Sequence, residues 1–125
     1  MLLNPYAKYK ENSINTATKE ELTLMLYDGC IKFMNLAKIG IEEKNIQKAN
    51  DNLLKAQAII TELDVTLNMD IEISKNMHSL YDFALSRLVD ANLKKDASFI
   101  DDAKIVIVDL RDAWKEAMNI VKRGK

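Results

Sequence analysis

The chain has 125 residues, 48% hydrophobic and 30% charged, which is enough for one domain with its own core. Its 18 basic and 19 acidic residues give a net charge of −1, which argues against nucleic acid as a partner, because phosphate binding relies on clustered lysine and arginine. Charged and amide residues interrupt every apolar run before the roughly 20 residues needed to cross a membrane. With no signal-peptide pattern either, we expect a cytoplasmic protein without membrane insertion.

The chain opens with an apolar segment, LLNPYAKY at residues 2–9. Two of the four tyrosines, Tyr6 and Tyr9, lie in this segment beside the only proline, Pro5. Apolar side chains are concentrated here although no convincing helix has begun. We therefore expect residues 1–17 to form a tail that folds over the rest of the protein.

The first predicted helix covers about residues 19–44. Thr18 followed three residues later by Glu21 matches a capping box, in which each residue satisfies a free backbone amide of the other. After Pro5 the chain has no further proline and only three glycines, so few residues interrupt helical structure.

Three more helices are predicted, at about residues 46–67, 71–93 and 99–122. Asn45 is a plausible N-cap of the first of these, and apolar residues within each recur at steps of three and four. The last helix is expected to start after Ser98. The β-branched run at residues 105–110 could instead form a buried strand, but the helical spacing continues through it.

Four helices joined by short connections predict an all-α fold, an antiparallel up-down-up-down four-helix bundle over residues 18–125 with an apolar N-terminal tail. No catalytic site is predicted. A carboxylate-bridged metal bundle needs at least two histidines, and His78 is the only one. Cys30 lies in an apolar stretch, where a desolvated thiol is inert. We expect no metal and no cofactor.

The first and last helices carry more apolar residues than one buried stripe requires. The stripes expected to face the core are Leu22, Met25, Leu26, Gly29, Phe33, Leu36 and Gly40 in the first helix, and Phe99, Ala103, Val106, Leu110, Ala113, Ala117 and Ile120 in the last. Second stripes consist of Leu24, Tyr27, Ile31 and Met34, and of Ile100, Ile107, Trp114 and Val121. Either these helices have wide buried faces, or the second stripes line a groove that something else covers; we favour the groove.

The N-terminal tail is one candidate to cover such a groove. Burying two tyrosines and one or two leucines contributes about 4–8 kcal/mol. Ordering about six residues costs about 6–12 kcal/mol. The two terms nearly cancel, so the tail would leave when a better ligand arrives.

Long stretches of the chain resemble one known family. NPYAKYKENSINTATKEELTLMLYDGCIKFMNLA, NDNLLKAQAIITEL, LYDFALSRLVDANLKKD and LRDAWKEAM resemble, in order and spacing, the FliS family of cytoplasmic flagellin chaperones. The resemblance implies a four-helix bundle that binds the disordered C-terminal segment of flagellin, prevents its premature polymerisation and helps deliver it to the flagellar type III export gate.

The resemblance also assigns a role to the tail, because the apolar N-terminal segment of the family lies over part of the binding surface until flagellin displaces it. Here that role falls on Tyr6 and Tyr9, with Leu3 a weaker candidate. The chain departs from many relatives where NMDIEIS, residues 68–74, replaces a glycine pair, so the connection there is expected to be shorter or more ordered.

From the second stripes, the predicted flagellin-binding groove consists of Leu24, Tyr27, Ile31, Met34, Ile100, Ile107 and Trp114. Such a groove would take amphipathic helical segments of a client that folds as it binds. The alternative function is a structural or adaptor bundle that self-associates through the same stripes, as a homodimer without a flagellin client.

Overall fold

The computed structural model describes residues 16–124. This part of the chain runs through α2 (Lys19–Glu42), α3 (Ile46–Val65), α4 (Glu72–Lys94) and α5 (Ala97–Arg123). Every end lies within two residues of the predicted one, and residues 105–110 are helical. Leu3, Tyr6 and Tyr9, the predicted tail residues, lie outside the described residues.

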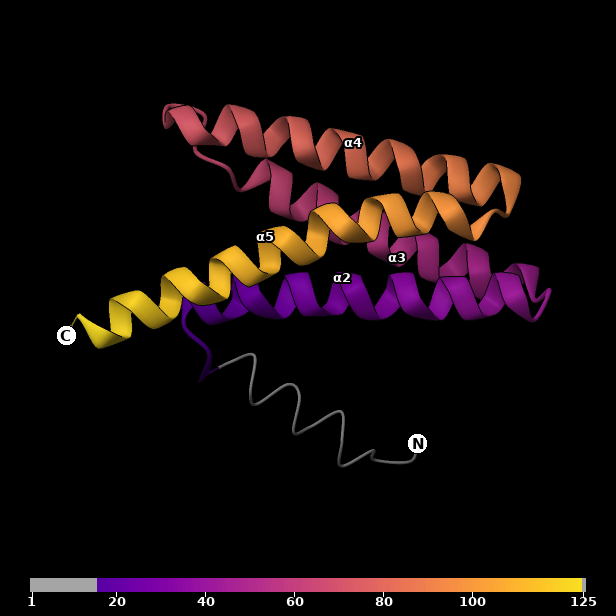
Figure 1. The fold of residues 1–125 in the computed structure, drawn as a ribbon, viewed down its shortest axis with the longest axis horizontal. Coiled ribbons are helices and arrows are strands. Elements are labelled where there is room, and N and C mark those ends of the chain that lie inside the picture. The colour runs from indigo at the N-terminus through magenta and orange to yellow at the C-terminus, as the bar shows by residue number, and fades with distance from the viewer. Residues whose placement is uncertain (1–15, 125) are drawn as a thin grey trace.

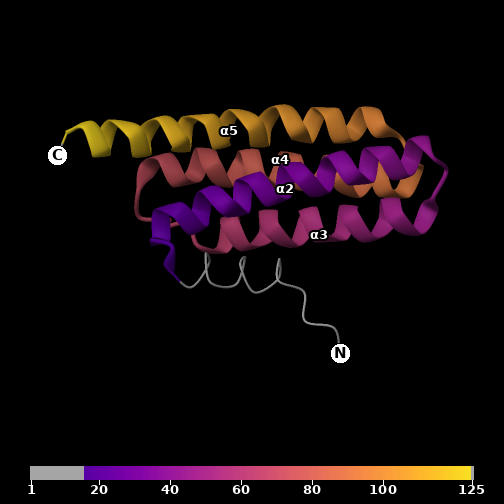
Figure 2. The same cartoon turned by 90° about the horizontal axis from the view of Figure 1, so that it is seen from below.

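The helices form a ring in which each one packs against its neighbours in the chain, and α5 returns to pack against α2 (Figure 1). Successive helices run in opposite directions, as the second view also shows (Figure 2). This arrangement confirms the predicted all-α up-down-up-down bundle. Among the described residues, none of the helices combines the length and the apolar character needed to span a membrane.

Side-chain caps explain where three of the helices begin. Asn45 accepts a hydrogen bond from the backbone N–H of Lys48 at 3.0 Å, which confirms it as the N-cap of α3. The predicted start of the last helix is wrong by two residues, because Asp96 is the N-cap of α5 and accepts from the backbone N–H of Ser98 at 2.9 Å. Hydrogen bonds from the Ser98 hydroxyl and backbone lower the pKa of the Asp96 carboxyl.

The core lies along the axis of the ring and combines a few large side chains with many small ones. The buried apolar residues are Tyr27, Cys30, Met34, Ala37, Ala49, Leu53, Ala56, Ile60, Leu63, Tyr81, Ala84, Leu88, Ala91, Ile100, Ala103 and Ile107. Alanines at the contacts let neighbouring helices approach closely. Helices α2 and α3 approach closely at Gly40, where an added Cβ would lie 2.7 Å from the backbone nitrogen of Ala49.

The last helix, α5, is the longest described and leaves the bundle at its C-terminal end. It begins beside α4, crosses to the start of α2 and continues past it (Figure 1). Its buried residues all fall in its first half, whereas Ala113, Ala117, Ile120 and Val121 are exposed. The C-terminal half of α5 therefore has an apolar face that the rest of the described bundle leaves uncovered.

Candidate functional site

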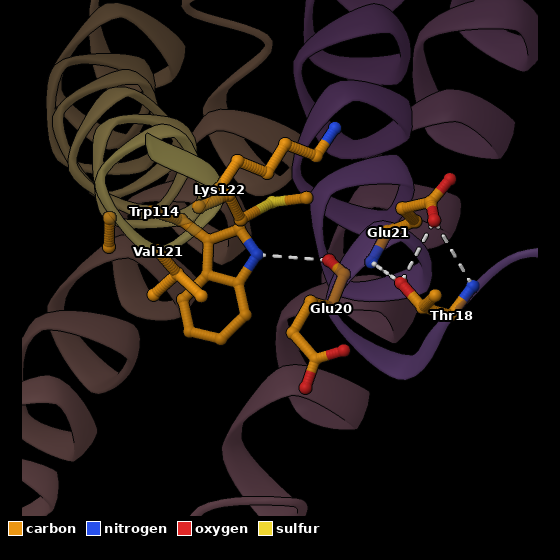
Figure 3. Close-up of a pocket in the computed structure, with 8 residues that line it drawn as sticks. Thr18, Glu20, Glu21, Trp114, Val121 and Lys122 are labelled. Atoms are coloured by element: carbon orange, nitrogen blue, oxygen red, sulfur yellow. Dashed lines mark hydrogen bonds between the residues drawn. The ribbon is translucent and has the colours of Figure 1, made fainter. Parts of the chain in front are cut away.

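The start of α2 and the C-terminal half of α5 border a hollow of about 510 Å³ (Figure 3). We call it the α2–α5 groove; it is lined by Thr18, Glu20, Glu21, Trp114, Ala117, Met118, Val121 and Lys122. The α5 wall is apolar except for Lys122, and the α2 wall is polar. A hollow of this size falls in the range of roughly 300–1,000 Å³ that is typical of ligand pockets.

The capping box fixes the α2 side of the groove. Thr18 Oγ1 accepts a hydrogen bond from the backbone N–H of Glu21 at 3.1 Å, and the Thr18 backbone N–H donates to Glu21 Oε1 at 3.5 Å. The predicted capping box is thus confirmed. Because its two members both line the groove, the box sets the start of the helix and one wall of the site together.

Trp114 joins the two walls. Its indole Nε1–H donates to the backbone carbonyl oxygen of Glu20 at 3.0 Å, across 94 residues of sequence (Figure 3). The ring also packs against the core from its half-buried position. Trp114 therefore holds the C-terminal half of α5 against the first turn of α2.

Ion pairs hold α2 and α5 together on the N-terminal side of Trp114. Arg111 Nε donates to Asp28 Oδ1 at 2.7 Å, and Lys38 Nζ donates to Asp101 Oδ1 at 2.9 Å. The hydrogen bond to Asp28 is the main reason that the pKa of Arg111 is raised, and both groups of each pair are partly exposed. Surface pairs of this kind each contribute little free energy, so their main effect is to set the alignment of the helices.

The structure corrects four of the seven predicted groove residues. Tyr27, Met34, Ile100 and Ile107 are no more than 1% exposed and belong to the core. Each helix packs against two neighbouring helices, and the face between these two contacts points to the axis of the bundle. In α2 and α5 this inward face carries much of the predicted second stripe. A partner cannot touch these side chains while the bundle keeps this packing.

The residues predicted for the core of these helices lie mainly at its margins. In α2, Leu26 and Phe33 are half-buried and Met25 is exposed, and in α5, Ala113 and Ala117 are exposed. The stripes predicted to line a groove therefore supply much of the core, and the stripes predicted for the core lie mostly at its edge or on the surface. Gly40 and Ala103 are the members of the predicted core stripes that are fully buried.

Three predicted groove residues keep accessible surface: Leu24, Ile31 and Trp114 are half-buried. Of these, Trp114 alone lines the α2–α5 groove. Met118 and Lys122 were not among the predicted groove residues, and Ala117 was predicted to face the core. The sequence does indicate the apolar wall of this groove, because Ala117, Met118 and Val121 follow Trp114 by three, four and seven residues and therefore share one face of a helix.

Cys30 and His78, the candidate nucleophile and metal ligand, do not line the α2–α5 groove. Within residues 16–124 there is no cluster of three or more His, Cys, Asp or Glu side chains suited to a metal ion. Burial raises the pKa of the Cys30 thiol to about 12, so it is a poor nucleophile near neutral pH. His78 pairs with a carboxylate of α3, its Nδ1 lying 2.7 Å from Asp64 Oδ1.

A family model and the similar proteins of known description all carry the same family name. The family model for flagellar protein FliS matches residues 2–121. A flagellar secretion chaperone FliS from Bacillus subtilis (strain 168) is 48% identical over 122 residues, covering 98% of this chain and 92% of that protein. A protein of the same description from Escherichia coli (strain K12) is 31% identical over 111 residues, covering 86% and 82%.

A solved structure shares the fold. The crystal structure of a flagellar chaperone from bacteria superposes with a TM-score of 0.74 at 24% identity, covering 91% of this chain and 94% of that one. At this identity the match supports the arrangement of the helices and leaves the binding residues to be argued from the chain itself.

Proposed function

This chain belongs to the FliS family, and from that premise we propose that it binds the disordered C-terminal segment of flagellin in the cytoplasm and keeps flagellin from polymerising before export. The family is one of flagellar secretion chaperones and not of enzymes, so the relevant chemistry is binding. Delivery of the bound flagellin to the type III export apparatus is the second half of this proposal.

The observation that carries the proposal is the uncovered apolar face of the C-terminal half of α5. Val121 is 59% exposed and Ile120 57%, and both follow the Trp114 anchor. An amphipathic helix places apolar side chains at the same spacing of three, four and seven residues as this face. Such a helix would bury its apolar side along α5 and set one or two anchor side chains into the α2–α5 groove.

Charges at the rim of the groove favour one type of client helix. Glu20 and Glu21 lie on the α2 side and Lys122 on the α5 side, where its side chain extends toward α2 (Figure 3). A client helix with basic residues along one edge and acidic residues along the other would complement both walls. These exposed charges would act mainly on orientation, because surface ion pairs contribute little free energy.

The N-terminal tail is proposed to compete with flagellin for the same surface. Thr18 lines the groove, so the segment that carries Leu3, Tyr6 and Tyr9 joins the bundle beside it. Apolar side chains attached this closely act at high effective concentration, and even a weak contact would shield the groove while it is empty.

The groove is tested by placing a charge on its exposed apolar wall. Val121→Asp should weaken binding of a flagellin C-terminal peptide about tenfold or more, which corresponds to about 1.4 kcal/mol, because the carboxylate would have to be desolvated under the client helix. Trp114 is the only tryptophan in the chain, so its emission should move to shorter wavelength as the peptide excludes water. Titration of that fluorescence measures both effects.

The matched control is Ile105→Asp, because Ile105 is also β-branched, lies on the same helix and is 64% exposed, but does not line the groove. Its affinity should stay within about twofold of the unchanged protein. Equal losses in the two variants, or peptide binding that leaves the tryptophan emission unchanged, would overturn the α2–α5 groove as the client site.

A further inference from the structure

The connection between α3 and α4 exposes a cluster of large apolar side chains. Val65, Met69, Ile71 and Ile73 are 69%, 47%, 52% and 62% exposed and fall within nine residues of sequence. We call these four residues the α3–α4 patch. Single exposed apolar residues are ordinary on protein surfaces, but a cluster at one turn is typical of an interaction site.

The backbone of this connection is ordered by its own hydrogen bonds. The N–H of Ile71 donates to the carbonyl of Asn68 at 3.1 Å, and the N–H of Ser74 donates to the carbonyl of Ile71 at 3.0 Å. Half-buried Leu67 packs against the core and ties the connection to the bundle. The patch is therefore presented in a fixed conformation, which lowers the entropy cost of binding a partner.

Acidic residues outnumber basic ones in the sequence around the patch. Residues 61–76 contain four of them, Glu62, Asp64, Asp70 and Glu72, against the single cation Lys75. The Asp64 carboxylate pairs with the His78 imidazole, whereas the other three acidic side chains are exposed. Such a rim attracts lysine and arginine and repels the phosphates of nucleic acids and of anionic lipids.

We propose that the α3–α4 patch docks a second protein, through a segment whose apolar side chains are flanked by lysine and arginine. The apolar side chains would cover Val65, Met69, Ile71 and Ile73, and the basic ones would pair with Asp70 and Glu72. None of these residues lines the α2–α5 groove, and Figure 1 draws the connection apart from the end of α5. The protein would thus hold a client and a second partner at the same time, and the proposal does not depend on the client being flagellin.

A synthetic amphipathic helix of leucine and lysine is a suitable probe, with the same peptide carrying glutamate in place of lysine as its counterpart. The lysine peptide should bind at least about tenfold more tightly than the glutamate peptide. Ile71→Ser with Ile73→Ser should weaken the lysine peptide about tenfold, and Asp70→Asn with Glu72→Gln should reduce the salt dependence of its binding. Fluorescence anisotropy of labelled peptides measures each effect.

The matched control is Leu93→Ser with Ile105→Ser, which removes two apolar side chains of the same size at residues that are 78% and 64% exposed elsewhere on α4 and α5. Equal weakening in the control, or equal binding of the two peptides, would overturn the proposal. Binding of anionic vesicles, or self-association, that disappears in Ile71→Ser with Ile73→Ser would overturn it in favour of a membrane or a second copy. Flagellin peptide binding should be unchanged in that variant, which separates this test from that of the groove.

Discussion

Tyr27 carries its phenol into the core, where its hydroxyl oxygen lies 2.5 Å from that of Tyr81. Burial raises the pKa of both tyrosines, so the pair stays neutral and one hydroxyl donates to the other. The hydrogen bond joins α2 to α4 across the ring. Tyr27 was predicted to line a groove because it belongs to the second apolar stripe of its helix. Its hydrogen-bond partner lies 54 residues away in the chain, so the sequence spacing does not indicate the pair.

Gly40 sets the distance between α2 and α3. In Gly40→Ala the new methyl would meet the backbone nitrogen and Cα of Ala49 at 2.7 and 3.1 Å, and backbone atoms cannot rotate away. We expect the free energy of unfolding to fall by about 1–3 kcal/mol. Urea unfolding followed by circular dichroism measures it.

Gly29 supplies the control for this prediction, because a methyl there would meet only the end of the Ile59 side chain at 3.5 Å, an ordinary contact. Gly29→Ala should therefore leave the fold intact and stabilise it by roughly 0.5–1 kcal/mol, the usual gain of alanine over glycine within a helix. A Gly40→Ala protein as stable as the unchanged one would show that the two helices can move apart without cost.

At the scale of elements, α5 has two halves with different surroundings. Its first half packs against both α2 and α4 and supplies Ile100, Ala103 and Ile107 to the core. Its second half is held to α2 by the Trp114 hydrogen bond and exposes the apolar face proposed to bind a client. One continuous helix is therefore both a wall of the bundle and the proposed docking surface.

The N-terminal tail is the other element with a proposed role, and a double substitution tests it. Tyr6→Ala with Tyr9→Ala should leave the helical circular dichroism spectrum unchanged and tighten flagellin-peptide binding by about two- to tenfold, because removing a competing contact raises the fraction of open groove. Isothermal titration calorimetry measures the affinity.

Lys8→Ala with Lys10→Ala is the matched control within the same segment, since it shortens two neighbouring side chains without removing the aromatic rings. Its affinity should equal that of the unchanged protein. If the tyrosine variant also bound the peptide with unchanged affinity, the tail would not act as a lid over the groove.

For the whole molecule, the alternative of a self-associating bundle makes a different prediction from a client-binding one. The second stripes expected to form a dimer interface are largely buried, with Tyr27, Met34, Ile100 and Ile107 inside the core. A homodimer through those side chains would require the bundle to open. Of the second stripes, Leu24, Ile31, Trp114 and Val121 keep accessible surface for either function.

Light scattering over a range of protein concentrations separates the two functions. A client-binding bundle should scatter as a monomer, and its mass should rise by that of the peptide when a flagellin C-terminal peptide is added. Buffer without peptide and a scrambled peptide serve as controls. A dimer whose mass is insensitive to flagellin peptide would favour the alternative function.

Much of this fold is determined by local features of the sequence. The Thr18 capping box, the Asn45 cap and the scarcity of glycine and proline specify where helices start and how far they run. Short connections then leave an antiparallel bundle as the natural arrangement. Each of these features involves residues only a few positions apart, so each can be identified from the sequence.

Only the tertiary structure decided which face of each helix points inward. The apolar residues of α2 and α5 cover a wide arc, and the choice between Tyr27 and Met25, or between Ile107 and Ala113, depends on where two neighbouring helices approach. That approach depends on contacts between residues far apart in the chain, such as Tyr27 with Tyr81 and Trp114 with Glu20. The α2–α5 groove arises from the second of these contacts, because α5 crosses from α4 to the start of α2 and leaves one apolar face of its last turns uncovered.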